Sequence, residues 1–268
     1  MKVVLSRKGF DSSNGGIVSP IFEDGTLVSF PIPSNDGDIY SDLQYKGISY
    51  SSILSDLQYR GDQFCHVDPD LDLHRRVIAI ENWIPAFGQI NSSATYLKNI
   101  GIKEGDLFLF FGNFHHVQRE KGHFKYIRQS GDFYKDNDLQ VIWGYLQVGK
   151  IIDNPEEQKL LWWHPHANDD RRNNRTNVIY VGSKRLSFDD SRPGVGLLPY
   201  DNKRVLTLKN SSKATWKMNP VYDPDHILCN RKNKAKQPCE GVYYAGIWQE
   251  LGLVESEACT AWAKEIVL

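Results

Sequence analysis

The chain has 268 residues, of which 40% are hydrophobic and 12% aromatic, and its 32 Lys and Arg against 33 Asp and Glu give a formal net charge of −1. This composition is typical of a soluble globular protein, and a chain of this length buries enough surface to fold without a disulfide or structural metal framework. No segment resembles a signal peptide or reaches the roughly 20 apolar residues of a membrane span, and the four cysteines form no CxxC pair. We therefore expect a cytoplasmic protein with no membrane partner.

The near-neutral total hides a segregation of charge along the chain. Residues 1–90 carry 7 Lys and Arg against 12 Asp and Glu, whereas residues 169–236 carry 15 Lys and Arg against 7 Asp. Local fields, and not the net charge, attract a charged ligand. The sequence therefore does not exclude a polyanion such as DNA as a partner.

The first third of the chain predicts strands around a polar loop. Residues 2–6 form a short apolar strand that enters the Gly-rich loop 9–16, and a loop directly after a strand is a common place for a site. Residues 17–22 and 26–32 flank Asp24-Gly25 and predict a β-hairpin. Residues 41–60 contain a near repeat, SDLQYK and SDLQYR, which we interpret as a local duplication.

The remaining elements alternate helices with strands. We predict a helix from Ser92 or Ser93 to Gly101, a central strand at 107–111 and, after a His- and Lys-rich insertion, a strand pair within 139–152. Further expected elements are a helix at 154–163, strands at 178–181 and 205–208, and a helix at 255–267. With no long linker, this order predicts one compact α+β domain over residues 1–268, with a mixed, partly barrel-like sheet.

The loop after the first strand is the first candidate site. Asp11 is a carboxylate that can stabilise the positive charge developing at a sugar when a glycosidic bond breaks, or activate water. Lys8 can neutralise a phosphate or act as a nucleophile, and Arg7 and Asn14 are candidate DNA contacts. The alternative is a solvent loop in which Asp11 forms an Asx-turn.

His164 and His166 form the second candidate site, directly after Trp162-Trp163. Two histidines at this position can serve as general acid or base, or bind a metal. The arginines that follow suit a site that holds a nucleic-acid backbone by charge; they are Arg171, Arg172 and Arg175. The alternative is two surface histidines beside a packed tryptophan pair.

Other polar and aromatic residues give weaker signals. His115, His116 and His123 lack the spacing of a zinc site, so we predict no metal and no cofactor. Trp143, Tyr145 and Trp163 are candidates for stacking on a base. Lys184 and Arg185 begin a basic series that either binds DNA or is a solvated face; it continues with Arg192, Lys203, Arg204, Lys209, Lys213, Arg231, Lys232, Lys234 and Lys236.

Several short motifs together resemble one family. They are SRKGFDSSNGG at 6–16, Ser19-Pro20, Asp24-Gly25, PIP at 31–33, Gly105-Asp106, WGYLQVG at 143–149, His164-Pro165-His166 and NVIY at 177–180. The chain resembles the third nucleotide-modification-associated domain family over most of its length. This resemblance implies a link to modified DNA bases, in bacteria and phages, more securely than it implies a reaction. Residues 105–152 are also similar to small PUA-like barrels, several of which hold a modified base.

These observations lead to a ranked set of functions. The first is an enzyme that flips a bulky modified base, for example glucosylated hydroxymethylcytosine, out of DNA and cuts its N-glycosidic bond in phage defence. The second is a non-catalytic reader of modified DNA. The third is an enzyme that installs the modification, which ranks last because the sequence has no phosphate-binding GxxxxGK[ST] or GxGxxG motif. The sequence leaves the oligomeric state open.

Overall fold

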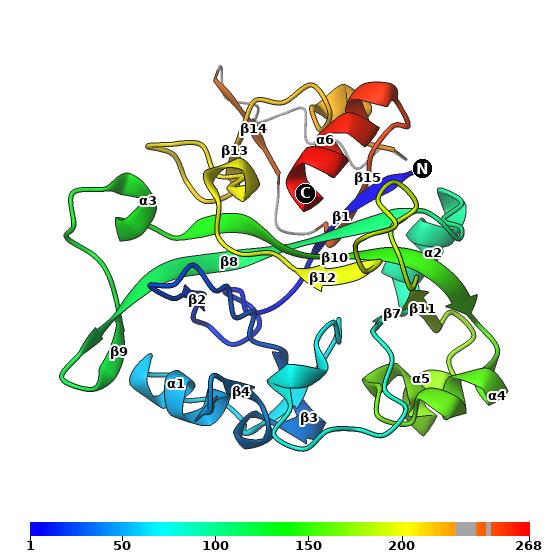
Figure 1. Ribbon diagram of the computed structural model, residues 1–268, viewed down its shortest axis with the longest axis horizontal. Helices are drawn as coiled ribbons and strands as arrows, with labels where there is room; N and C mark the ends of the chain where they lie inside the picture. The colour runs from blue at the N-terminus through cyan, green and yellow to red at the C-terminus, as the bar shows by residue number, and fades with distance from the viewer. Residues whose placement is uncertain (229–239, 245–247) are drawn as a thin grey trace.

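The structure, a computed structural model, describes residues 1–228, 240–244 and 248–268 (Figure 1). Its strands are β1 (Val3–Arg7), β2 (Ser19–Ile21), β3 (Ile32–Ile39), β4 (Gln44–Tyr45), β5 (Ile48–Ser49), β6 (Phe64–His66), β7 (Ala86–Gln89), β8 (Leu107–Glu120), β9 (His123–Tyr126), β10 (Leu139–Ile152), β11 (Val178–Gly182), β12 (Val195–Leu197), β13 (Thr215–Lys217), β14 (Gly241–Tyr243) and β15 (Glu250–Gly252). Its α-helices are α1 (Tyr50–Asp56), α2 (Asn91–Asn99), α3 (Phe133–Asp136), α4 (Pro155–Gln158), α5 (Asp169–Arg172) and α6 (Glu257–Val267).

A mixed sheet forms the centre of this α+β fold. Its main path runs β15-β1-β8-β10-β11-β7, while β12 pairs with β10, and β2 and β9 pair with β8. β1 runs parallel to β8 and antiparallel to β15. The long strands β8 and β10 cross the middle of the molecule, with α6, β13 and β14 on one side and α1, β3 and β4 on the other (Figure 1).

Alternating side chains of the central strands bury both faces of the sheet. Leu107, Leu109 and Phe111 of β8 pack in the cluster that includes α6, whereas Phe108 and Phe110 pack with α2 and β7 on the opposite face. A strand covered on both faces has no polar side to present, which explains the uninterrupted apolar run at the start of β8. The predicted central strand is confirmed.

The sheet curls so that its two ends approach each other. The rings of Phe87 in β7 and Phe108 in β8 lie 5.0 Å apart, although two strands separate β7 from β8 in the sheet. The Gln89 side chain in β7 donates a hydrogen bond to Glu250 in β15, so side chains bridge the two end strands. Their backbones do not pair in the described part of the chain, and the sheet is not a closed barrel.

Several local predictions are confirmed with shifted bounds. β1, β11 and α6 lie where expected, and α2 ends before Gly101, whose φ of +70° suits a helix terminus. The N-cap of α2 is Ile90, not Ser92 or Ser93. The predicted helix at 154–163 begins with α4 and continues as a 3-10 helix at Lys159–Leu161.

Other segments differ because long-range pairing overrides local pattern. The predicted hairpin keeps its turn at Gly25, with φ +81°, but β2 pairs with β8, and the backbone ladder between the two arms is limited to the bridge Ile21–Leu27. The strand pair expected within 139–152 is one strand, β10, with a register shift between Ile142 and Gly144. The segment 205–208 makes only isolated bridges.

The His-rich insertion is partly sheet. β8 continues through it to Glu120, and the ring nitrogens of the buried His115 lie 2.8 Å from Asp138 Oδ1 and 2.6 Å from the Ile127 carbonyl. A histidine with both nitrogens partnered is tolerated inside a strand.

None of the described helices combines the length and apolar character required to span a bilayer. Two cysteines and four members of the predicted basic series lie outside the described residues: Cys229, Cys239, Arg231, Lys232, Lys234 and Lys236.

Candidate functional site

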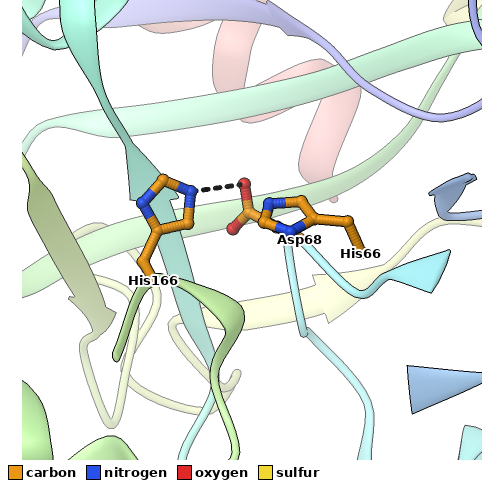
Figure 2. Close-up of side chains that lie close together, drawn as sticks. All are labelled: His66, Asp68 and His166. Atoms are coloured by element: carbon orange, nitrogen blue, oxygen red, sulfur yellow. Dashed lines mark ion pairs between the residues drawn. The ribbon is translucent and has the colours of Figure 1, made fainter. Parts of the chain in front are cut away.

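Two segments far apart in the sequence, 66–68 and 164–166, bring a carboxylate and three imidazoles together. His66 ends β6, Asp68 follows two residues later, and His164 and His166 flank the start of a 3-10 turn at Pro165–Ala167 between α4 and α5. Figure 2 shows the Asp68 carboxylate between the rings of His66 and His166. We call His66, Asp68, His164 and His166 the His-Asp cluster.

The Asp68 carboxylate is the centre of the cluster. Its Oδ1 accepts a 2.7 Å hydrogen bond from the backbone N–H of Gly88 in β7 and lies 3.3 Å from His164 Nε2. Its Oδ2 lies 3.9 Å from His166 Nε2, the dashed contact in Figure 2. Since the Asp68 side chain is only 5% exposed, little bulk water screens its charge.

The hydrogen bonds of the two C-terminal histidines define their tautomers. His164 Nδ1 accepts from the backbone N–H of His166 at 3.2 Å, so its ring proton is on Nε2, the nitrogen that faces Asp68. His166 Nδ1 lies 2.7 Å from Asn177 Oδ1. The Asn177 amide nitrogen donates to Gln158 Oε1 and to the His166 carbonyl, so its oxygen is the acceptor and His166 Nδ1 is the donor. His166 Nε2 therefore presents a lone pair to Asp68.

Burial and charge separate the protonation states of the cluster. Burial lowers the pKa of His66 well below its usual value and that of His166 to about 4, although the Asp68 charge opposes both shifts. Burial alone would raise the pKa of Asp68, but the contact with His164 and the electrostatic influence of His166, His164 and Lys8 outweigh it and hold the pKa well below its usual range. At neutral pH the cluster is thus a carboxylate beside uncharged His66 and His166 rings.

Lys8 links the His-Asp cluster to the junction between the two ends of the sheet. Its ammonium group lies 3.2 Å from Glu250 Oε1 and 4.5 Å from the centre of the Phe87 ring. Ser6 also donates to Glu250 Oε1, at 3.1 Å. The charge of Lys8 also lowers the pKa of Asp68, which places Lys8 in the same region as His164 and His166, although the ammonium group itself contacts Glu250 and the Phe87 ring.

The turn that carries the two histidines is held by its neighbours. Arg171 and Arg172 donate to the carbonyls of Pro165 and Ala167, at 3.4 and 2.8 Å. Arg172 also pairs with Asp169. Both arginines were predicted to bind DNA, and in the structure each has part of its hydrogen-bonding capacity committed to the turn.

Asp11 lies in a different environment. Its Oδ1 accepts from the backbone N–H groups of Ser13 and Asn14, both at 2.8 Å, and from the Asn14 side chain at 3.1 Å. Its Oδ2 lies 3.5 Å from Arg7. This is the Asx-turn of the alternative interpretation, and the described contacts of Asp11 are with its own loop.

The aromatic residues proposed to stack on a base are buried. Trp143, Tyr145 and Trp163 are 2%, 5% and 8% exposed. Trp162, by contrast, is 66% exposed and lines a cleft of about 350 Å³ together with Trp163, Ile78 and Pro165. A free aromatic face at this site therefore belongs to Trp162, which the sequence analysis did not choose.

Exposed basic side chains remain on the surface. Arg175, Lys184 and Arg185 are exposed, and Arg175 lines a cavity of about 500 Å³ with Lys98 and Asn177. Since Asn177 also bonds His166, this cavity lies close to the His-Asp cluster. Arg175 is thus a cation near the cluster, whereas Arg7 lies beside Asp11.

His66 and Asp68 were missed by the sequence analysis. The available signal was a His-x-Asp pair, HVD, after a short stretch of aromatic and apolar residues. Such a pair is common by chance, and nothing in the local pattern connects it with residues almost 100 positions later. The segment 68–70 after β6 and the 164–167 turn both contact β7, and this tertiary contact brings them together.

Comparison with known proteins gave one match. A family model described as nucleotide modification associated domain 3 matches residues 2–251. No curated protein and no solved structure matched the chain.

Proposed function

Because the chain belongs to the nucleotide modification associated domain 3 family, we propose that it is an enzyme acting on modified bases in DNA. In this proposal it hydrolyses the N-glycosidic bond of a bulky modified base, such as glucosylated hydroxymethylcytosine, and so acts against phage genomes that carry such bases. The protein flips the base out of the helix, because the bond is inaccessible in stacked DNA.

The observation that carries this proposal is the buried, ionised Asp68 carboxylate. Cleavage of a glycosidic bond develops positive charge on the sugar, and a carboxylate held in a water-poor site stabilises that charge strongly. Asp68 has the required environment, since the contact with His164 and the nearby charge of Lys8 help to hold its pKa well below the usual range. It takes the role that the sequence analysis gave to Asp11, whose oxygens are occupied by its own loop.

The proposed reaction consumes one water molecule. The bond between C1′ and the base nitrogen breaks with its electron pair leaving on the base, and the water oxygen bonds to C1′. Asp68 accepts the proton of the attacking water, and that proton then passes to the departing base nitrogen. His164 Nε2–H, 3.3 Å from Asp68 Oδ1, orients the carboxylate throughout.

Burial restricts access to the reacting groups. The four side chains of the His-Asp cluster are at most 8% exposed, so a substrate reaches them only when a covering segment moves aside. Arg175, Lys184 and Arg185 would hold the DNA backbone meanwhile.

The test is base release from defined DNA. Purified protein is incubated with duplexes containing cytosine, hydroxymethylcytosine or glucosylated hydroxymethylcytosine, and free base and abasic sites are quantified. We expect release from a modified duplex and none from the unmodified one. Asp68→Asn should abolish release, while His123→Gln, at an exposed histidine paired with Asp56, should not change it. Absence of release from every modified duplex would refute the proposed reaction.

A second candidate is a non-catalytic reader of modified DNA, favoured by the exposed Trp162 ring in its cleft. Aromatic faces bind unstacked bases by stacking, worth about 1–3 kcal/mol per base. A reader binds modified DNA and leaves it intact, and Trp162→Ala weakens binding by about tenfold or more. An enzyme releases base from the modified DNA that it binds, whereas a reader does not. Measuring both binding and base release on the cytosine, hydroxymethylcytosine and glucosylated hydroxymethylcytosine duplexes therefore distinguishes an enzyme from a reader.

A further inference from the structure

Asp68 and His166 turn two hydrogen-bond acceptors toward each other, which is electrostatically unfavourable. His166 Nδ1–H donates to Asn177, so its Nε2 lone pair points at Asp68 Oδ2, 3.9 Å away. Asp68 Oδ1 already accepts from Gly88. Two acceptors therefore face each other in a nearly buried position, an arrangement that a positive charge between them stabilises.

A third donor completes the arrangement. His66, Asp68 and His166 each offer one ligand atom, and these atoms lie within 4.8 Å of one another. Ligands on a tetrahedral zinc ion with bonds of 2.0–2.2 Å are about 3.4 Å apart. The 3.9 Å distance between Asp68 Oδ2 and His166 Nε2 is close to this value, and the ligand atom of His66 lies within 4.8 Å of those of Asp68 and His166 (Figure 2).

Residues around His166 and Asp68 orient them by hydrogen bonds, as the neighbours of metal ligands usually do. Metal-binding histidines usually donate their second ring N–H to a carboxylate or carbonyl oxygen, which orients the ring. Asn177 does this for His166, and the Asn177 amide is itself held by Gln158 Oε1 at 2.9 Å. The Gly88 N–H likewise holds Asp68.

We propose that His66, Asp68 and His166 bind one divalent transition-metal ion of the zinc type. Two imidazoles and one carboxylate favour Zn²⁺, Fe²⁺ or Mn²⁺ over Mg²⁺ and Ca²⁺, which prefer oxygen ligands throughout. Three protein ligands leave a coordination position open, as in catalytic and not structural zinc sites. The proposal goes beyond the proposed function, because metal binding is measured without DNA. With an ion bound, Asp68 would be a ligand, and the ion would supply the activation of water that the proposed reaction assigns to the free carboxylate.

The test uses Zn²⁺ as the probe. The full chain is treated with a chelator, dialysed and titrated with Zn²⁺ by calorimetry, and metal content is measured after dialysis. We expect one Zn²⁺ per chain in the wild type and an affinity at least about 100-fold weaker in His66→Gln, Asp68→Asn and His166→Gln. Asn177→Ala should weaken it by about 10-fold or more, because its role is to orient His166. Mg²⁺ should not compete.

His123→Gln is the matched control. His123 Nδ1 lies 2.7 Å from Asp56 Oδ1, so it is also a histidine paired with an aspartate, but its side chain is 69% exposed and no second histidine is part of that pair. Its Zn²⁺ affinity should equal that of the wild type. Equal affinity in the three ligand variants, or no Zn²⁺ binding below about millimolar in the wild type, would overturn the proposal.

A second measurement guards against variants that fail to fold. Co²⁺ replaces Zn²⁺ in the wild-type protein, and its visible spectrum reports the ligands directly. We expect bands of a nitrogen and oxygen environment without the thiolate charge-transfer band that cysteine ligands produce. A thiolate band would place the metal on cysteines and contradict the proposal. If Zn²⁺ binds as expected but no modified DNA is cleaved, the metal site stands and only the proposed reaction fails.

Discussion

Asp11 and Asp68 are both largely buried carboxylates near a cation, but their oxygens are used differently. The Asp11 loop closes on itself, with three hydrogen bonds to Oδ1 from Ser13 and Asn14 and Arg7 beside Oδ2. Asp68 Oδ1 is held by Gly88, while its Oδ2 faces the lone pair of His166. Both carboxylates are largely buried and lie near a cation. Of the two, Asp68 has an oxygen, Oδ2, that faces a nitrogen able to bind a metal ion, His166 Nε2.

The two aspartates differ in the acceptor capacity that their hydrogen bonds leave free. A carboxylate whose acceptor sites are filled by neighbouring N–H groups has a structural role, since its bonds stabilise the fold and leave no capacity for a substrate or ion. The contacts of Asp11 come from residues within four positions in the chain. Those of Asp68 come from β7 and from the 164–167 turn, which the fold brings together.

The largest expected contrast is catalytic. Asp68→Asn should reduce base release by about 10³-fold or more, because the charge that stabilises the sugar is removed, while Asp11→Asn should change it by less than about 5-fold. Single-turnover release from the best modified duplex measures both. An equal or larger effect at Asp11 would reverse the comparison.

The next contrast is the effect of Zn²⁺ on the free energy of unfolding. Zn²⁺ at about 100 times its dissociation constant should raise the free energy of unfolding by about 2.7 kcal/mol, because the ion binds the native state. The increase should disappear in Asp68→Asn and persist in Asp11→Asn. Thermal unfolding with and without Zn²⁺ measures it, and an increase retained by Asp68→Asn would place the ion elsewhere.

A third contrast concerns the glycine that contacts each aspartate, Gly88 at Asp68 and Gly15 at Asp11. A Cβ at Gly88 would lie 2.3 Å from the His166 ring, and one at Gly15, where φ is +91°, would lie 2.4 Å from the Phe10 ring. Both Gly→Ala variants should lose about 1–3 kcal/mol of unfolding free energy, since each overpacks a buried ring. Only Gly88→Ala should also lower Zn²⁺ affinity, by tenfold or more. Chemical denaturation and calorimetry together distinguish the two, and a loss of Zn²⁺ affinity in Gly15→Ala would contradict their separation.

The structural role of Asp11 predicts a smaller change. Asp11→Ala removes the acceptor for three donors and should cost about 1 kcal/mol of unfolding free energy, whereas Asp11→Asn keeps an oxygen at that position and should cost less. Urea denaturation measures both variants. Equal losses would show that the charge, paired with Arg7, matters more than the turn.

The smallest expected effect concerns DNA binding near each aspartate. Arg175 is exposed, whereas Arg7 is 18% exposed and lies beside Asp11. Arg175→Gln should lower the slope of log affinity against log salt by about 0.9, the value for one phosphate contact, and Arg7→Gln should leave it unchanged. Salt titration of DNA binding by fluorescence anisotropy tests this, and a larger change for Arg7 would move the DNA path to the Asp11 loop.

Local patterns were enough to predict several elements and half of the His-Asp cluster. Strand β1, the start of β8 and helix α6 follow from apolar runs and helical spacing, because these depend on nearest neighbours along the chain. His164 and His166 were recognisable because they are two residues apart. The predicted strand at 205–208 makes only isolated bridges, to Val141 and to Trp216, because the extent of pairing depends on neighbours that the local sequence does not reveal.

Residue type and short spacing were sufficient to identify the family motifs, the α+β class and the candidate residues Lys8, His164 and His166. Which aspartate the histidines face depends on the tertiary fold. His66 and Asp68 meet the 164–167 turn at β7, where the Gly88 N–H donates to Asp68 and the His166 ring packs against Gly88. Contacts across about 100 residues arise from packing, which no local spacing encodes.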